Sequence, residues 1–194
     1  MSKIENRETY LQNAITELRP LFKHHGFPVP KLVKVTCGWP SKSAGRSNKR
    51  RVGECWDKTA SADKKTTNII ISMVIEDGVA ALDILAHELV HAAVGNEHAH
   101  KGPFKTLARA IGLEGKLTAT TAGVELTKTL KAIVKKIGKY PHSKIDFDSR
   151  KKQSTRMVKI ECLFCGFIAR ASRSALEKCG HPTCGCGEEL VAVS

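Results

Sequence analysis

The sequence predicts an α+β fold that is followed by a small C-terminal module. Two observations predict the fold: apolar residues recur at helical spacing in several segments, and β-branched runs lie between those segments. A third observation, the crowding of cysteines near the C-terminus, predicts the module. With 194 residues, 41% of them hydrophobic, the chain has the material for one core-forming domain and a small second unit.

Helices are expected where apolar residues recur every three or four positions. Residues 8–25 fit this spacing, and Pro20 marks a point where the helix kinks or ends early. A second helix is expected over 78–94, between Asp77 as N-cap and Gly95 as the C-terminal stop. Because this helix is apolar nearly all round, we expect it to be buried. Two further helices are expected near 102–111 and 122–137.

Strands are expected at 31–37, 52–56 and 68–73, the last of which is a β-branched run. The polar and basic segment 41–51 is expected to be an exposed loop. Residues 139–159 form a basic connector with few large apolar residues. We therefore place two domains at 1–149 and 150–194.

The formal net charge is +13 and the sequence pI is about 9.6. A surface this positive attracts polyanions, of which nucleic acid is the commonest, so DNA is an expected partner. Basic residues cluster around the predicted module, where they either contact phosphates or form an ordinary solvated face: Arg150, Lys151, Lys152, Arg156, Lys159, Arg170, Arg173 and Lys178.

No segment has the pattern of a signal peptide or the length of apolar run that spans a bilayer. We therefore expect a cytoplasmic protein, or a nuclear one in a cell that has a nucleus, with no membrane partner. The sequence does not indicate an oligomeric state.

The run His87-Glu88-Leu89-Val90-His91 lies within the predicted buried helix. Residues four apart share one helical face, so His87 and His91 can bind one zinc ion through their imidazoles. Glu88 is placed to act as the general base, taking a proton from a water that zinc acidifies. Two hydrogen-bonded core histidines are the alternative, but an ionised Glu88 between them would be costly to bury.

A catalytic zinc ion usually has three protein ligands, so a third is needed. Four downstream residues are candidates: Glu97, His98, His100 and Glu114. Asp83, one turn before His87, is either a residue that orients an imidazole or an ordinary polar helix position.

These residues resemble the SprT-like metallopeptidases, the group that includes the Spartan DNA–protein crosslink proteases. The resemblance rests on Ala86-His87-Glu88-Leu89-Val90-His91 and on His100-Lys101-Gly102-Pro103-Phe104, and it extends to the preceding strand and the cysteine-rich C-terminus. It implies a minimal zincin-like metallopeptidase domain, a C-terminal zinc ribbon, and His100 as the third zinc ligand.

Cysteines in the C-terminal module have the spacing of a zinc site. Cys162 and Cys165 form one pair and Cys184 and Cys186 the other, so four thiolates would close the coordination shell of a structural zinc ion. Cys179 or His181 remains an alternative for one of the four ligands. The expected cofactors are thus two zinc ions, one catalytic and one structural.

The sequence therefore predicts an HExxH-type zinc metallopeptidase that hydrolyses peptide bonds in protein substrates, in particular those of DNA-associated proteins. The alternative is a nucleic-acid-binding zinc protein with little or no protease activity. The residue Glu88 favours the enzyme, because a purely structural metal site has no use for a carboxylate there.

Overall fold

A computed structural model describes residues 6–42, 50–146, 149 and 157–193. The chain divides into two compact units, Met1–Asp148 and Ser149–Ser194, each of which is described by itself below. Several basic positions of the sequence analysis lie outside the described residues: Arg46, Lys49, Arg150, Lys151, Lys152 and Arg156.

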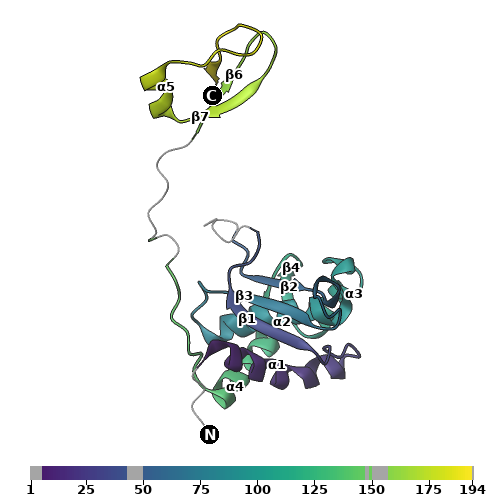
Figure 1. Cartoon of the computed structure of the whole chain (residues 1–194). Coiled ribbons are helices and arrows are strands. Elements are labelled where there is room, and N and C mark those ends of the chain that lie inside the picture. Colours follow the sequence, from purple (N-terminus) through teal and green to yellow (C-terminus); the bar gives the residue numbers. More distant parts are fainter. Residues whose placement is uncertain (1–5, 43–49, 147–148, 150–156, 194) are drawn as a thin grey trace. The chain divides into compact units, whose positions relative to one another are not determined.

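The first unit is an α+β domain (Figure 1). Its helices are α1 (Arg7–His24), α2 (Gly78–Val94), α3 (Pro103–Ala110) and α4 (Val124–Ile137), with 3-10 turns at Lys58–Ala60 and Asn96–His98. Its strands are β1 (Val33–Gly38), β2 (Gly53–Trp56), β3 (Thr67–Ser72), β4 (Leu113–Lys116) and β5 (Ala119–Ala122). The α+β prediction is thus confirmed.

Three strands form the main sheet in the order β1-β3-β2. β1 is parallel to β3 and β2 is antiparallel to it, which leaves β2 at one edge of the sheet. Helix α1 packs along β1, helix α2 packs along β2 and β3, and α4 packs against both helices. The position of α2 beside an edge strand is what brings helix and strand side chains together in the site described below.

The buried helix α2 begins and ends where local signals predict. The Asp77 carboxylate accepts a hydrogen bond from the Ala80 amide at 2.8 Å, and Gly95 follows the helix with φ of +95°. Most of its apolar side chains are buried and the rest are partly buried, as expected for a helix that is apolar nearly all round. Helix α1 continues through Pro20 to His24, so the early stop considered at this proline does not occur.

The antiparallel hairpin β4–β5 was not predicted from the sequence. Only Leu113 of β4 is buried, and β5 alternates between exposed and half-buried positions without any large apolar residue. Such strands lack the alternation of apolar and polar residues on which strand prediction depends. The hairpin contributes one wall of the site.

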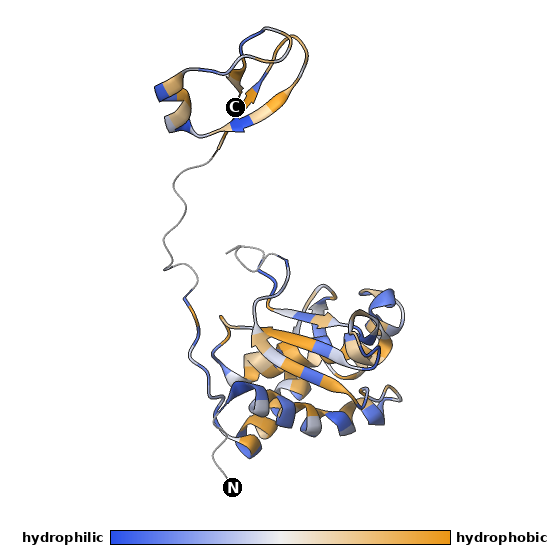
Figure 2. Cartoon of the chain, viewed as in Figure 1, coloured by the Kyte–Doolittle hydropathy of each residue, from blue (hydrophilic) through white to orange (hydrophobic). Residues whose placement is uncertain are grey.

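The core of the first unit lies between the sheet and its helices and is mostly aliphatic. Figure 2 shows long apolar stretches along the strands of this sheet. The largest fully buried side chains include Tyr10, Phe22 and Phe104. Among the described residues, no helix combines the length and apolarity needed to cross a membrane.

The second unit is a small three-stranded antiparallel sheet in the order β7-β6-β8 with one short helix. Its elements are β6 (Val158–Glu161), β7 (Ile168–Ala171), α5 (Arg173–Cys179) and β8 (Val191–Val193). Its buried core consists of only Ile160, Cys162, Cys184 and Leu190 among the described residues. So small a core needs another source of stability, such as a metal ion.

Candidate functional site

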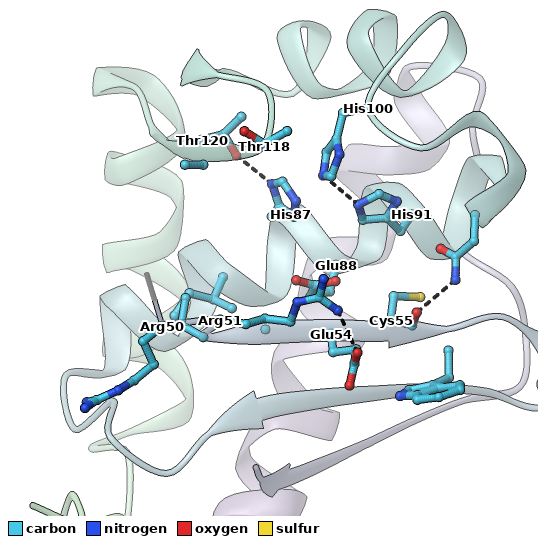
Figure 3. Close-up of a pocket in the computed structure, with 16 residues that line it drawn as sticks. Arg50, Arg51, Glu54, Cys55, His87, Glu88, His91, His100, Thr118 and Thr120 are labelled. Carbon is cyan, nitrogen blue, oxygen red and sulfur yellow. Dashed lines mark hydrogen bonds and ion pairs between the residues drawn. The ribbon is translucent and has the colours of Figure 1, made fainter. Parts of the chain in front are cut away.

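Three histidines of the first unit converge on one point. His87 and His91 lie one turn apart on α2, and His100 comes from the loop that precedes α3 (Figure 3). One ring nitrogen from each lies within 4.8 Å of the others. Of the candidates for a third ligand, the structure therefore brings His100 to the pair.

The spacing of the ring nitrogens suits a tetrahedral metal ion. His91 Nε2 and His100 Nε2 are 3.2 Å apart. Two nitrogens that each lie about 2.05 Å from zinc at a tetrahedral angle would be separated by about 3.3 Å. The His91 and His100 rings thus have the spacing of two zinc ligands, and the His87 ring nitrogen lies within 4.8 Å of both.

Two neighbours hold the histidine rings in place, and neither role was predicted. Thr120 Oγ1 of β5 lies 2.8 Å from His87 Nδ1. If Nε2 binds a metal, Nδ1 carries the ring proton and donates a hydrogen bond to this hydroxyl. Phe104 of α3 is fully buried and its ring centroid lies 5.2, 4.4 and 4.8 Å from those of His87, His91 and His100.

Burial keeps the three imidazoles neutral. It lowers the pKa of His87 to about 4 and the pKa of His91 to about 3, and neighbouring imidazoles add to both effects. Burial also lowers the pKa of His100, with a further contribution from the positive charge of Arg51. Neutral imidazole is the form that binds metals, so at neutral pH no proton has to leave before a metal enters.

Glu88 lies next to the histidines with 7% of its surface exposed. Burial raises the pKa of its carboxyl group to about 8, against the opposing effect of the Arg51 charge. A carboxyl group with a pKa near neutrality can both accept and return a proton under physiological conditions. The side chain is thus suited to general acid–base chemistry.

The histidines and Glu88 open onto a cleft of about 660 Å³. Its walls are the edge strand β2, helix α2 and residues 118–120, which lead into β5 (Figure 3). Cys55 and Trp56, which the sequence suggested only as strand positions, both line this cleft, and Trp56 is 43% exposed. The volume suits a segment of polypeptide or a small molecule.

A charged pair lies on the β2 side of the cleft. Arg51 Nη1 donates a hydrogen bond to Glu54 Oε1 at 2.7 Å. Burial by itself would raise the pKa of Glu54, but hydrogen bonds from the Ser41 hydroxyl at 2.6 Å and the Ser41 amide at 2.8 Å, together with Arg51, lower it. Glu54 is therefore ionised and fixes the Arg51 guanidinium beside the cleft.

The other candidate residues lie apart from the histidine group. His98 is in the turn after α2, with Nε2 3.8 Å from Glu97 Oε1 and both side chains exposed. Glu114 lies on β4 against Gly123. Asp83 was a candidate to orient the His87 imidazole, but His87 Nδ1 pairs with the Thr120 hydroxyl instead.

Four cysteines of the second unit form a second candidate metal centre. Cys162 and Cys186 have their sulfurs 3.5 Å apart, and those of Cys165 and Cys184 are 3.4 Å apart. Sulfurs about 2.3 Å from a tetrahedral zinc ion would be separated by about 3.8 Å, whereas a disulfide requires about 2.05 Å. The arrangement therefore fits a metal ion and not a pair of disulfides.

Backbone amides approach these sulfurs as expected for a zinc knuckle. Hydrogen bonds from the amides of Cys165 and Phe164, together with one from the Cys186 thiol, lower the pKa of Cys162 to about 7. Despite hydrogen bonds from backbone amides, the neighbouring thiols raise the pKa values of Cys165 and Cys186, so of these three Cys162 is the one that most readily forms the thiolate that binds metals. The two alternative ligands lie elsewhere: Cys179 ends α5 and is exposed, while His181 Nδ1 pairs with the Leu190 carbonyl group.

An apolar surface on the second unit was also not predicted. Leu163, Phe164 and Phe167 are exposed by 76%, 79% and 55%, although each is a large apolar residue. The basic side chains of Arg170, Arg173 and Lys178 are exposed on the same unit. The signal was present in the sequence, since Phe164 directly precedes Cys165 and Phe167 follows it two positions later.

Comparison of the chain with protein-family models, curated proteins and solved structures finds no match. The two candidate metal centres and the cleft beside the first are therefore the features that indicate a function.

Proposed function

We propose that this protein is a zinc-dependent metallopeptidase that hydrolyses peptide bonds in proteins associated with DNA. The observation that carries the proposal is the placement of a buried carboxylate, Glu88, beside three converging imidazoles at the wall of an open cleft. In this proposal the first unit is a minimal zincin-like domain and the second a zinc ribbon. The resemblance to SprT-like metallopeptidases supports the same assignment.

His87, His91 and His100 would hold the catalytic zinc ion. Zinc so held would supply a Lewis acid that acidifies an attacking water and polarises the scissile carbonyl. Glu88 accepts the proton of the attacking water and returns it to the leaving amine, a role for which a raised pKa is suited. Cys162, Cys165, Cys184 and Cys186 would hold a structural zinc ion, since four thiolates leave no open position.

The edge strand β2 offers a place for an extended peptide. The Val52 carbonyl accepts a hydrogen bond from the Ser72 amide of β3, so the alternation of an antiparallel pair turns the main-chain groups of Gly53 and Cys55 away from β3. The Asn96 side chain donates a hydrogen bond to the Cys55 carbonyl at 2.8 Å, which agrees with this carbonyl facing away from β3 and being open to a donor. A substrate can add to this edge as a further strand.

Contact with DNA is supported by charge and by the exposed aromatic residues of the second unit. The net charge of +13 provides phosphate attraction. Phe164 and Phe167 are exposed on the same small unit as exposed basic side chains, and aromatic and basic residues together are the combination used to stack unpaired bases and hold the strand. We therefore expect single-stranded DNA to bind the second unit.

The second candidate function is a nucleic-acid-binding zinc protein without protease activity. The exposed aromatic and basic residues of the second unit favour it as much as they favour the enzyme. Glu88 disfavours it, because burying a carboxyl group costs stability and a purely structural metal site gains nothing from that cost.

A protease assay on DNA-bound and free proteins, with and without DNA, tests the proposal, and the Glu88→Gln variant is the control. We expect cleavage by the wild-type protein and none by the variant. Salt-dependent binding to DNA, with no cleavage of any protein by the zinc-loaded chain, would favour the second candidate function.

A further inference from the structure

In the part of the chain that the structure describes, hydrogen bonds do not fix the position of the Glu88 carboxylate. Among the described residues, none donates a hydrogen bond to it: the nearby Arg51 guanidinium bonds to Glu54 instead, and acts on Glu88 only through its charge. A long side chain without such bonds keeps one orientation only when packing restricts it. The residues that pack against the carboxylate therefore decide where the proposed base lies.

Gly53, the first residue of β2, lies directly against the Glu88 carboxylate. A Cβ atom at this position would lie 2.4 Å from Glu88 Oε1 and 3.0 Å from Glu88 Cδ. It would also lie 2.6 Å from Ile84 Cγ2, one turn earlier on α2. These separations are far below van der Waals contact, so any side chain at position 53 would collide with the carboxylate.

The glycine is required for space and not for backbone conformation. Gly53 lies in a regular strand and lacks the positive φ that favours glycine elsewhere in this chain, as at Gly95. Glycine within a strand is otherwise destabilising, and it is found where another group must approach the backbone closely. Here the approaching group is the side chain of the proposed general base.

We propose that Gly53 is a positioning residue for Glu88, an inference that rests on the proposed function. The bare Cα of Gly53 gives the carboxylate a slot between β2 and α2, beside the histidines. A methyl group at position 53 would displace the carboxylate from this slot, since the three atoms nearest to it belong to Glu88 and Ile84 and none to a histidine of the site. The strand that would pair with the peptide thus also sets the location of the base.

Gly53→Ala tests this role, and Gly38→Ala is a matched control at the end of another strand of the same sheet. A Cβ at Gly38 would meet only Ile70 Cγ2, at an ordinary 3.6 Å. We expect Gly53→Ala to keep its zinc content but lose kcat by about tenfold or more, the range for a misplaced proton-transfer group, with a smaller change in KM. Gly38→Ala should keep both values. Wild-type kcat in zinc-loaded Gly53→Ala would overturn the inference.

A second measurement does not depend on activity. In metal-free protein, overpacking at position 53 should lower the melting temperature by about 3 °C or more. In a Glu88→Ala background this loss should shrink to about half or less, because two of the three closest contacts are then gone. An equal loss in both backgrounds would show that Gly53 does not accommodate Glu88. A chain without peptidase activity would refute the proposed function but leave this coupling intact.

Discussion

Thr120→Val should weaken zinc binding at the histidine site without changing the shape of the cleft. Valine matches threonine in size but cannot pair with His87 Nδ1, which Thr120 Oγ1 contacts at 2.8 Å. A hydrogen bond of this kind is worth about 1–2 kcal/mol when its partner is left half-buried without a replacement. That free energy corresponds to an increase in Kd of about 5–30-fold, consistent with the effects known for residues that orient metal ligands.

Competition with a chromophoric chelator at fixed pH measures the zinc affinity of wild type, Thr120→Val and a control, Thr118→Val. Thr118 also lines the cleft, but no hydrogen bond joins it to a histidine among the described residues. To keep the signal specific, the four-cysteine site is saturated with zinc first. Unchanged affinity in Thr120→Val, or an equal loss in both variants, would refute the view that Thr120 orients His87.

Three further predictions concern metal binding and pH. His100→Ala should lower zinc affinity at the first site far more than His98→Ala, and the reverse order would favour His98 as ligand. Changing Cys162 and Cys165 together to Ser should reduce zinc content, measured by elemental analysis, from two ions per chain to one. In metal-free protein, Glu88→Gln should have a higher melting temperature than wild type, by a difference that grows as pH rises. The folded pKa of Glu88, about 8, exceeds the value of 4.5 expected when unfolded. The wild type therefore loses stability as pH rises from 4.5 to about 8, because the unfolded chain ionises Glu88 more readily, and the uncharged glutamine avoids this loss.

Local signals made helix α2 and two of the histidines predictable. The capping Asp77, the terminating Gly95 and the apolar run between them are all local features, and helical spacing alone places His87 and His91 on one face. The third histidine could not be derived in this way. His100 follows a turn whose path depends on tertiary packing, so it was chosen through the family resemblance.

Residues that complete the site have roles that the sequence pattern does not mark. Thr120 lies on the hairpin β4–β5, whose strands lack an alternating apolar pattern. Gly53 lies on a predicted strand, but its contact with Glu88 depends on how α2 lies across the sheet. Arg51 belongs to a segment expected to be an exposed loop, yet Glu54 holds it beside the cleft. Contacts between distant segments set each of these roles, and composition and periodicity do not report them.

The measurement that tests the central claim most directly compares zinc content with peptidase rate in Glu88→Gln. Glutamine keeps the shape of the side chain but cannot accept a proton, and Glu88 is not among the three grouped histidine ligands. We predict that Glu88→Gln folds, retains two zinc ions per chain, and hydrolyses peptides slower by a factor on the order of 100 or more. His87→Ala should lose activity through loss of the metal instead. If Glu88→Gln hydrolyses at the wild-type rate any substrate that the native protein cleaves, Glu88 is not the base and the proposed mechanism is wrong.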